Sequence, residues 1–79
     1  EPIKLTPREY SVLEFLMRNK GRVVTKTQIM QAIWDDNYGG DVNIVEVYVR
    51  YLRKRIDVPF GLESIRTVRG SGYCLSDDQ

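Results

Sequence analysis

The sequence predicts an α+β domain that is mainly α-helical, with three helices followed by a C-terminal β-hairpin. Two capping motifs mark helix starts, a basic amphipathic segment indicates a third helix, and two strand-like runs flank a glycine-rich turn near the C-terminus. Because 79 residues support one small core, we expect a single domain over residues 1–79.

The first helix is predicted near residues 7–19. Thr6 is placed as its N-cap, Pro7 occupies the first helical position, and Glu9 can complete a capping box. Gly21 ends the segment. The predicted core stripe consists of Tyr10, Leu13, Leu16 and Met17, widened by Val12 and Phe15.

A second helix is predicted near residues 26–35, where Thr25 and Gln28 repeat the capping-box pattern. Before it, Val23-Val24 is a short β-type run that can add a third strand to the hairpin. After it, residues 35–40 are acidic and rich in turn formers. The predicted apolar face consists of Ile29, Met30, Ile33 and Trp34.

The third helix, predicted near residues 43–56, has two unlike faces. At about 100° per residue, its apolar residues fall within an arc of roughly 60°, which we expect to be buried, leaving the opposite edge open to an anion. A start at Asp41 and a start at Asn43 with Glu46 as capping partner are both open, and residues 58–61 end the helix. The apolar edge is Val45, Val49, Leu52 and Ile56, and the opposite edge is Asn43, Val47, Arg50 and Lys54.

The C-terminal hairpin is predicted from two short strands, residues 64–69 and 73–75. The turn between them is Gly70-Ser71-Gly72, whose glycines give the backbone the positive-φ freedom that a hairpin tip requires. The net charge of +1 is unevenly spread: residues 1–42 are balanced, whereas residues 43–73 carry a surplus of three positive charges. The surplus lies on the third helix and the hairpin, so these two elements are the expected binding surface for a polyanion.

The composition disfavours several chemistries. The single Cys74 cannot form a disulfide within the chain, and the absence of histidine disfavours a metal site and His-dependent catalysis. No convincing carboxylate pair is present either, so we expect neither an enzyme nor a cofactor. One unpaired cysteine fits a reducing cytoplasm, and no apolar run approaches the length of a membrane span, so we expect a soluble, cytoplasmic protein.

The order of the elements is typical of a winged helix-turn-helix, in which the hairpin is the wing. Five segments closely resemble the DNA-binding effector domain of OmpR/PhoB-type response regulators, and together they span almost the whole chain. These segments are LTPREYSVL (residues 5–13), GRVVTKTQI (21–29), AIW (32–34), VEVYVRYLRKRI (45–56) and IRTVRGSGY (65–73).

The resemblance implies the output domain of a bacterial two-component transcription factor, which binds double-stranded DNA sequence-specifically. In that family a receiver domain, phosphorylated on an aspartate, precedes the effector domain and promotes pairing on repeated half-sites, so a homodimer on DNA is expected of the full-length protein. Family effector domains also open with a four-stranded sheet, of which residues 1–5 resemble only the last strand. We therefore expect a truncated fragment, with the N-terminal sheet largely missing and no receiver domain, in which parts of Val12 and Phe15 are exposed.

The resemblance also implies which residues contact DNA. Arg50 and Arg53 match positions that touch bases or backbone, Glu46 matches an acidic position that can accept a hydrogen bond from cytosine N4, and Arg69 matches an arginine that probes the minor groove. The expected major-groove set is Asn43, Glu46, Val47, Arg50, Tyr51 and Lys54. The expected phosphate-contacting set is Trp34, Arg53 and Thr67, and the expected wing set is Arg66 and Arg69.

Some of these expectations have alternatives. Trp34 either contacts phosphate or completes the core. The loop after the second helix matches the region where family members touch RNA polymerase, although a loop of this composition is by default only solvated. Its residues in question are Asp35, Asp36, Asn37 and Tyr38.

The chain departs from the family pattern on the third helix. Asn43-Ile44 stands where Arg-Thr is frequent, and Tyr51 stands where a second cation is frequent. Each base contact is worth about 1–3 kcal/mol, so we expect a DNA site that is not a copy of a relative's. The rival function is a winged-helix protein-interaction module, which would not need the basic residues of the helix and hairpin.

Overall fold

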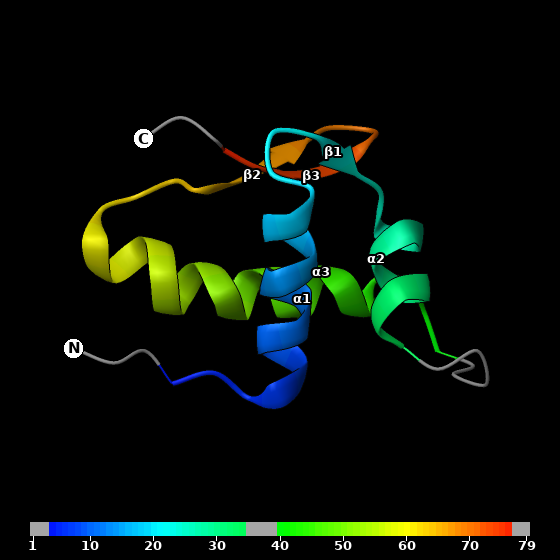
Figure 1. Cartoon of the computed structure of the whole chain (residues 1–79), viewed down its shortest axis with the longest axis horizontal. Helices are drawn as coiled ribbons and strands as arrows, with labels where there is room; N and C mark the ends of the chain where they lie inside the picture. Colours follow the sequence, from blue (N-terminus) through cyan, green and yellow to red (C-terminus); the bar gives the residue numbers. More distant parts are fainter. Residues whose placement is uncertain (1–3, 35–39, 77–79) are drawn as a thin grey trace.

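The computed structural model describes residues 4–34 and 40–76. Three α-helices pack against a small three-stranded sheet, and Figure 1 shows α1 crossing α3 on one side of that sheet. The predicted fold class is confirmed. In chain order the elements are α1 (Pro7–Arg18), β1 (Val23–Val24), α2 (Lys26–Ile33), α3 (Ile44–Leu52), the π-helical turn η1 (Arg53–Asp57), the 3-10 turn η2 (Val58–Phe60), β2 (Ile65–Val68) and β3 (Gly72–Leu75).

The sheet is antiparallel with the strand order β1-β3-β2, so the last strand lies in the middle. Val24 pairs with Tyr73, and Ile65 pairs with Leu75. The predicted third strand at Val23–Val24 is thereby confirmed. A Cβ on Gly72 would lie 2.0 Å from the backbone oxygen of Val24, so the close approach of β1 requires glycine there.

Both predicted capping boxes are present. The Thr6 hydroxyl accepts from the Glu9 amide at 3.2 Å, and the Glu9 carboxylate accepts from the Thr6 amide at 3.0 Å. At the start of α2, the Thr25 hydroxyl accepts from the Gln28 amide at 3.0 Å, and the Gln28 side-chain oxygen accepts from the Thr25 amide at 2.8 Å. These reciprocal bonds satisfy amides that the first turn of a helix would otherwise leave free.

The α3 helix begins at Ile44 with Asn43 as its N-cap residue, the second of the two starts left open by the sequence, and Asp41 precedes it. The Asp41 carboxylate accepts from the Asn43 amide at 3.0 Å and the Asp41 backbone oxygen accepts from the Ile44 amide at 3.1 Å. Asn43 makes no side-chain cap bond, and the capping partnership with Glu46 that this start allowed is not formed, because the Asn43 amide donates to Asp41 instead. Glu46 is instead held by a side chain of α2, as described below.

The core lies where the three helices and the sheet meet. Ile56, the last residue of the predicted apolar edge of the third helix, is only partly buried, whereas the other three residues of that edge are fully buried. The largest fully buried side chains are Val12, Leu16, Ile29, Val45, Val49 and Leu52. The hairpin adds Ile65, Tyr73 and Leu75.

The predicted core stripe of the first helix is partly wrong. Tyr10 and Met17 are 57% and 56% exposed, whereas Val12, expected to be partly uncovered, is 0% exposed. The buried face is centred on Val12 and Leu16 and includes Glu9, whose carboxylate is bonded to the N-cap and to Arg55. The buried face of α1 thus includes a carboxylate and is turned away from the stripe that hydrophobicity alone predicts.

The third helix continues past Leu52 with changed geometry. Residues Arg53–Asp57 form a π turn in which the Val58 amide donates to the Arg53 oxygen, and the 3-10 turn after it ends at Gly61 with φ 64°. The predicted end of the helix is confirmed, whereas the π turn departs from the 3.6-residue period assumed for residues 43–56. A π turn adds a residue to one turn and so changes which side chains face the core.

Candidate nucleic-acid interface

The outward face of α3 carries most of the residues predicted to enter the major groove. Asn43, Glu46, Arg50 and Tyr51 are exposed, and Val47 is half-buried. Lys54, in the π turn that follows, is also exposed. Val45, Val49 and Leu52 on the other face are fully buried, so the two-faced helix inferred from periodicity is confirmed.

Tyr51 is held against a row of aromatic rings. Its ring meets that of Tyr48 edge to face at a centroid distance of 5.7 Å, and Tyr48 meets Trp34 in the same way at 5.3 Å. Trp34 is 8% exposed and the guanidinium of Arg8 lies 4.9 Å from the centre of its ring. The packing supports the core role for Trp34, and it gives Tyr51 a fixed base from which to project.

The wing is the β2–β3 hairpin. Arg66 and Arg69 are both exposed on it. The Ser71 amide donates to the Val68 oxygen at 2.9 Å and Gly70 has φ 76°, so the turn closes at the predicted place. The wing arginines are therefore presented on a hydrogen-bonded scaffold.

An open groove of about 440 Å³ separates the wing from the helices. Its helical wall is formed by the start of α2 and by α3, and its other wall is the hairpin tip with Arg69. The residues that line it are Thr25, Lys26, Thr27, Val42, Glu46 and residues 67–73.

Lys26, which the sequence analysis did not assign to the site, bridges two helices in this groove. Its ammonium group forms an ion pair with the Glu46 carboxylate and also donates to the Asn43 side-chain oxygen at 3.3 Å. The hydrogen bond to Glu46 is the main reason why the pKa of Lys26 is raised above its ordinary value of 10.5. No local pattern could have found this contact, because 20 residues separate the partners.

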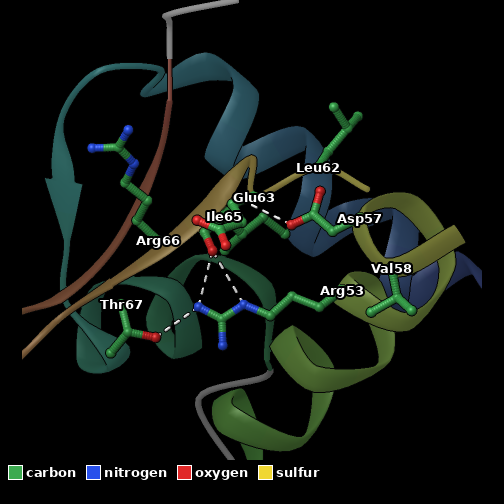
Figure 2. A pocket seen from close by; sticks show the side chains of 8 residues that line it. All are labelled: Arg53, Asp57, Val58, Leu62, Glu63, Ile65, Arg66 and Thr67. Atoms are coloured by element: carbon green, nitrogen blue, oxygen red, sulfur yellow. Dashed lines mark hydrogen bonds between the residues drawn. The ribbon is translucent and has the colours of Figure 1, made fainter. Parts of the chain in front are cut away.

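Two residues predicted to contact phosphate are bonded to one another. Arg53 donates to the Ile65 backbone oxygen from Nε at 3.1 Å and from Nη2 at 3.0 Å, and Nη2 also donates to the Thr67 hydroxyl at 2.6 Å. Asp57 accepts from the Ile65 amide at 3.3 Å. Figure 2 shows that Arg53 and Asp57 both bond the backbone of Ile65, and together they form a clamp on β2, the edge strand of the wing.

The space beside this clamp is a second open groove of about 550 Å³ (Figure 2). Its walls carry Arg53 and Arg66 but also Asp57 and Glu63, so they offer no net positive charge to attract a polyanion. Asp57 is 3% exposed, and its Oδ1 atom has no hydrogen-bond partner among the described residues. The residues that line the groove are Arg53, Asp57, Val58, Leu62, Glu63, Ile65, Arg66 and Thr67.

Other expectations concern sites outside this interface. The loop residues Asp35, Asp36, Asn37 and Tyr38 lie outside the described residues. Within residues 4–34 and 40–76, no cluster of potential metal ligands is found. No described helix is long and apolar enough to cross a membrane.

The chain is similar in sequence to bacterial regulators. Residues 1–75 match the family described as transcriptional regulatory protein, C terminal. The chain is 47% identical over 76 residues to the transcriptional regulatory protein TcrA of Mycobacterium tuberculosis, covering 96% of the chain and 30% of TcrA. It is 39% identical over 77 residues to the two-component response regulator PhoP of Pseudomonas aeruginosa, covering 98% and 34%. The chain thus spans about a third of the length of these relatives.

The structure is similar to solved domains of regulators. The C-terminal domain of the nisin resistance regulator NsrR matches with a TM-score of 0.81 at 34% identity, over 100% of this chain and 80% of that one. The DNA-binding domain of the response regulator AdeR, solved in complex with an intercistronic region, matches with a TM-score of 0.83 at 27% identity, over 95% and 74%.

Proposed function

The chain belongs to the family of C-terminal domains of transcriptional regulatory proteins, and from this premise we propose that it binds double-stranded DNA sequence-specifically as the output domain of a two-component response regulator. The observation that carries the proposal is the division of α3 into a buried apolar edge and an exposed face bearing Arg50. This face is continued by Lys54 in the π turn and lies beside a wing with two exposed arginines. The solved AdeR complex supports it, because that domain has a similar fold.

In this proposal α3 enters the major groove, which admits a single helix. Arg50 supplies the bidentate donor that suits guanine, Glu46 an acceptor that suits the amino group of cytosine, and Tyr51 a ring and hydroxyl. Asn43, Val47 and Lys54 complete the contacting face. The outward face of α3 is free to enter the groove because its apolar edge, Val45, Val49 and Leu52, packs against the core on the other side.

The wing and the groove beside it would hold the DNA backbone. Arg69 would reach the minor groove, because narrow A/T-rich minor grooves concentrate negative potential. Arg66 would lie near phosphate. Arg53 and Thr67 use part of their hydrogen-bonding capacity on each other. Arg53 therefore contributes mainly by fixing the wing, with Nη1 remaining for a phosphate.

The wider assembly is proposed by likeness to the regulators. Because the chain spans about a third of its relatives, the unit of residues 1–79 would act beside a receiver domain in a longer protein. We propose a homodimer on repeated half-sites, a contact with RNA polymerase through residues 35–38, and a cytoplasmic location.

Selection of bound duplexes from a random pool tests the proposal. We expect a consensus to emerge and the affinity for it to fall steeply with salt. With about five phosphates neutralised per domain, log affinity should fall with log salt at a slope of roughly −4 to −5. No enrichment over successive rounds, or an affinity that ignores salt, would contradict DNA binding.

A further inference from the structure

One lysine outside α3 bonds to two of the side chains that are predicted to contact bases in the major groove. Lys26 is the first residue of α2, and its ammonium group bonds both the Glu46 carboxylate and the Asn43 side-chain oxygen. The Lys26 and Glu46 side chains are 32% and 47% exposed, so the pair lies at the surface of the groove next to the wing.

The contact leaves Glu46 with a defined hydrogen-bonding capacity. Lys26 occupies Oε2, whereas Oε1 takes part in no hydrogen bond among the described residues. The Lys26–Glu46 pair carries no net formal charge, so phosphates repel it less than they would a free carboxylate. It can therefore approach DNA as an oriented acceptor, which is what the amino group of cytosine requires.

Asn43 is restricted by the same lysine. Its oxygen accepts from Lys26 at 3.3 Å and its amide nitrogen donates to Asp41 at 3.4 Å. A free asparagine can bind adenine with both its oxygen and its nitrogen. With both atoms engaged, Asn43 is less able to make that bidentate contact.

We propose that Lys26 is a positioning residue that sets the base preference of α3, orienting Glu46 toward a C·G pair and withholding Asn43 from adenine. The inference rests on the proposed DNA binding. It assigns selectivity to a residue that is not on the recognition helix. A lysine that only neutralised a phosphate would instead strengthen binding to all sequences alike.

The test measures base preference position by position. Duplexes are selected from a random pool with the unaltered chain, and affinities are then measured on duplexes that carry each of the four base pairs at every position of the consensus. The variants are Lys26→Met, Glu46→Gln and the double variant, with Lys20→Met as a matched control. Lys20 is exposed in the turn after α1, so its removal changes the net charge equally.

We expect Lys26→Met to reduce the preference for a C·G pair about tenfold at one position, while the other positions keep their order of preference. The double variant should lose no more preference than Glu46→Gln, because both changes remove one coupled contact. Lys20→Met should leave every preference intact. Urea unfolding of each variant, with little change expected in its midpoint, checks that the fold is retained.

A uniform loss for Lys26→Met at all positions, equal to that of the control, would overturn the inference and leave DNA binding standing. Additive losses in the double variant would also overturn it. Failure of the unaltered chain to enrich any duplex would contradict the proposed function itself, so the two failures are distinguishable.

Discussion

The recognition helix is held differently at its two ends. At the N-terminal end, Lys26 holds Glu46 through an ion pair that is open to water. At the C-terminal end, the side chain of Arg55 is 43% exposed but its partner at 2.8 Å, Glu9, is only 4% exposed, and the 3%-exposed Asp57 binds the edge strand. Exposed ion pairs stabilise little, whereas removing a partner from a buried carboxylate is costly.

The difference assigns DNA recognition to the N-terminal end of α3 and attachment to the rest of the fold to its C-terminal end. The exposed contacts at the start of α3 lie where a base or a phosphate would approach, and they contribute little to the stability of the fold. The two buried carboxylates at its end, Glu9 and Asp57, connect the π turn to α1 and to the wing. Variants at the C-terminal end should therefore change stability first, and variants at the N-terminal end should change DNA selection first.

The largest effect is expected for Glu9→Ala. This variant removes the capping bond to Thr6 and the pair with Arg55 together, and we expect it to lower the free energy of unfolding by about 2 kcal/mol. The matched control is Glu14→Ala, whose exposed pair with Arg18 spans 3.3 Å on the same helix and should cost roughly 0.5 kcal/mol or less. Urea denaturation measures both, and equal losses would refute the proposed contrast between buried and exposed pairs.

A smaller loss is expected for Arg53→Met. The variant leaves the Ile65 oxygen and the Thr67 hydroxyl without their donor, which should cost about 1 kcal/mol. Arg66→Met on the same strand is the control, because Arg66 is exposed and has no hydrogen bond among the described residues. The clamp would be disproved if thermal unfolding placed the two variants at the same stability.

The smallest effect concerns alkaline pH. Burial raises the pKa of the Tyr73 phenol above its ordinary value of 10.0, and the hydrogen bond to Glu46 raises that of Lys26 above 10.5. The folded state therefore keeps protons that the unfolded state releases, so stability should be retained below about pH 10 and fall as pH rises further. Tyr73→Phe should flatten this fall when urea midpoints are compared across the range. An unchanged pH profile in the variant would contradict the assignment to Tyr73.

Local motifs explain why much of the fold could be predicted. The Thr6 and Thr25 capping boxes depend on residues three positions apart, and the spacing of Val45, Val49 and Leu52 defines the buried edge of α3 directly. Each of these signals lies within one element. They could therefore be recognised from the sequence without knowing which other elements pack against that helix.

The errors arose where distant elements meet. Glu9 lies on the core face of α1 and pairs with Arg55, 46 residues away, whereas Tyr10 and Met17 of the predicted stripe are exposed. Lys26 was missed for the same reason. The residues exposed on the outward face of α3 could be predicted from the helical period, but their intramolecular partners depend on how the helices pack.

The affinity of Arg50→Ala for the selected duplex tests the central claim, that the outward face of α3 reads DNA, most directly. Arg50 is exposed on that face, and Arg22→Ala, at an exposed position just before β1, removes the same charge elsewhere. We expect Arg50→Ala to weaken binding about tenfold or more and Arg22→Ala to weaken it about twofold or less. Equal losses of affinity for the two variants would show that binding depends only on the net positive charge of the domain, and would contradict base recognition by α3.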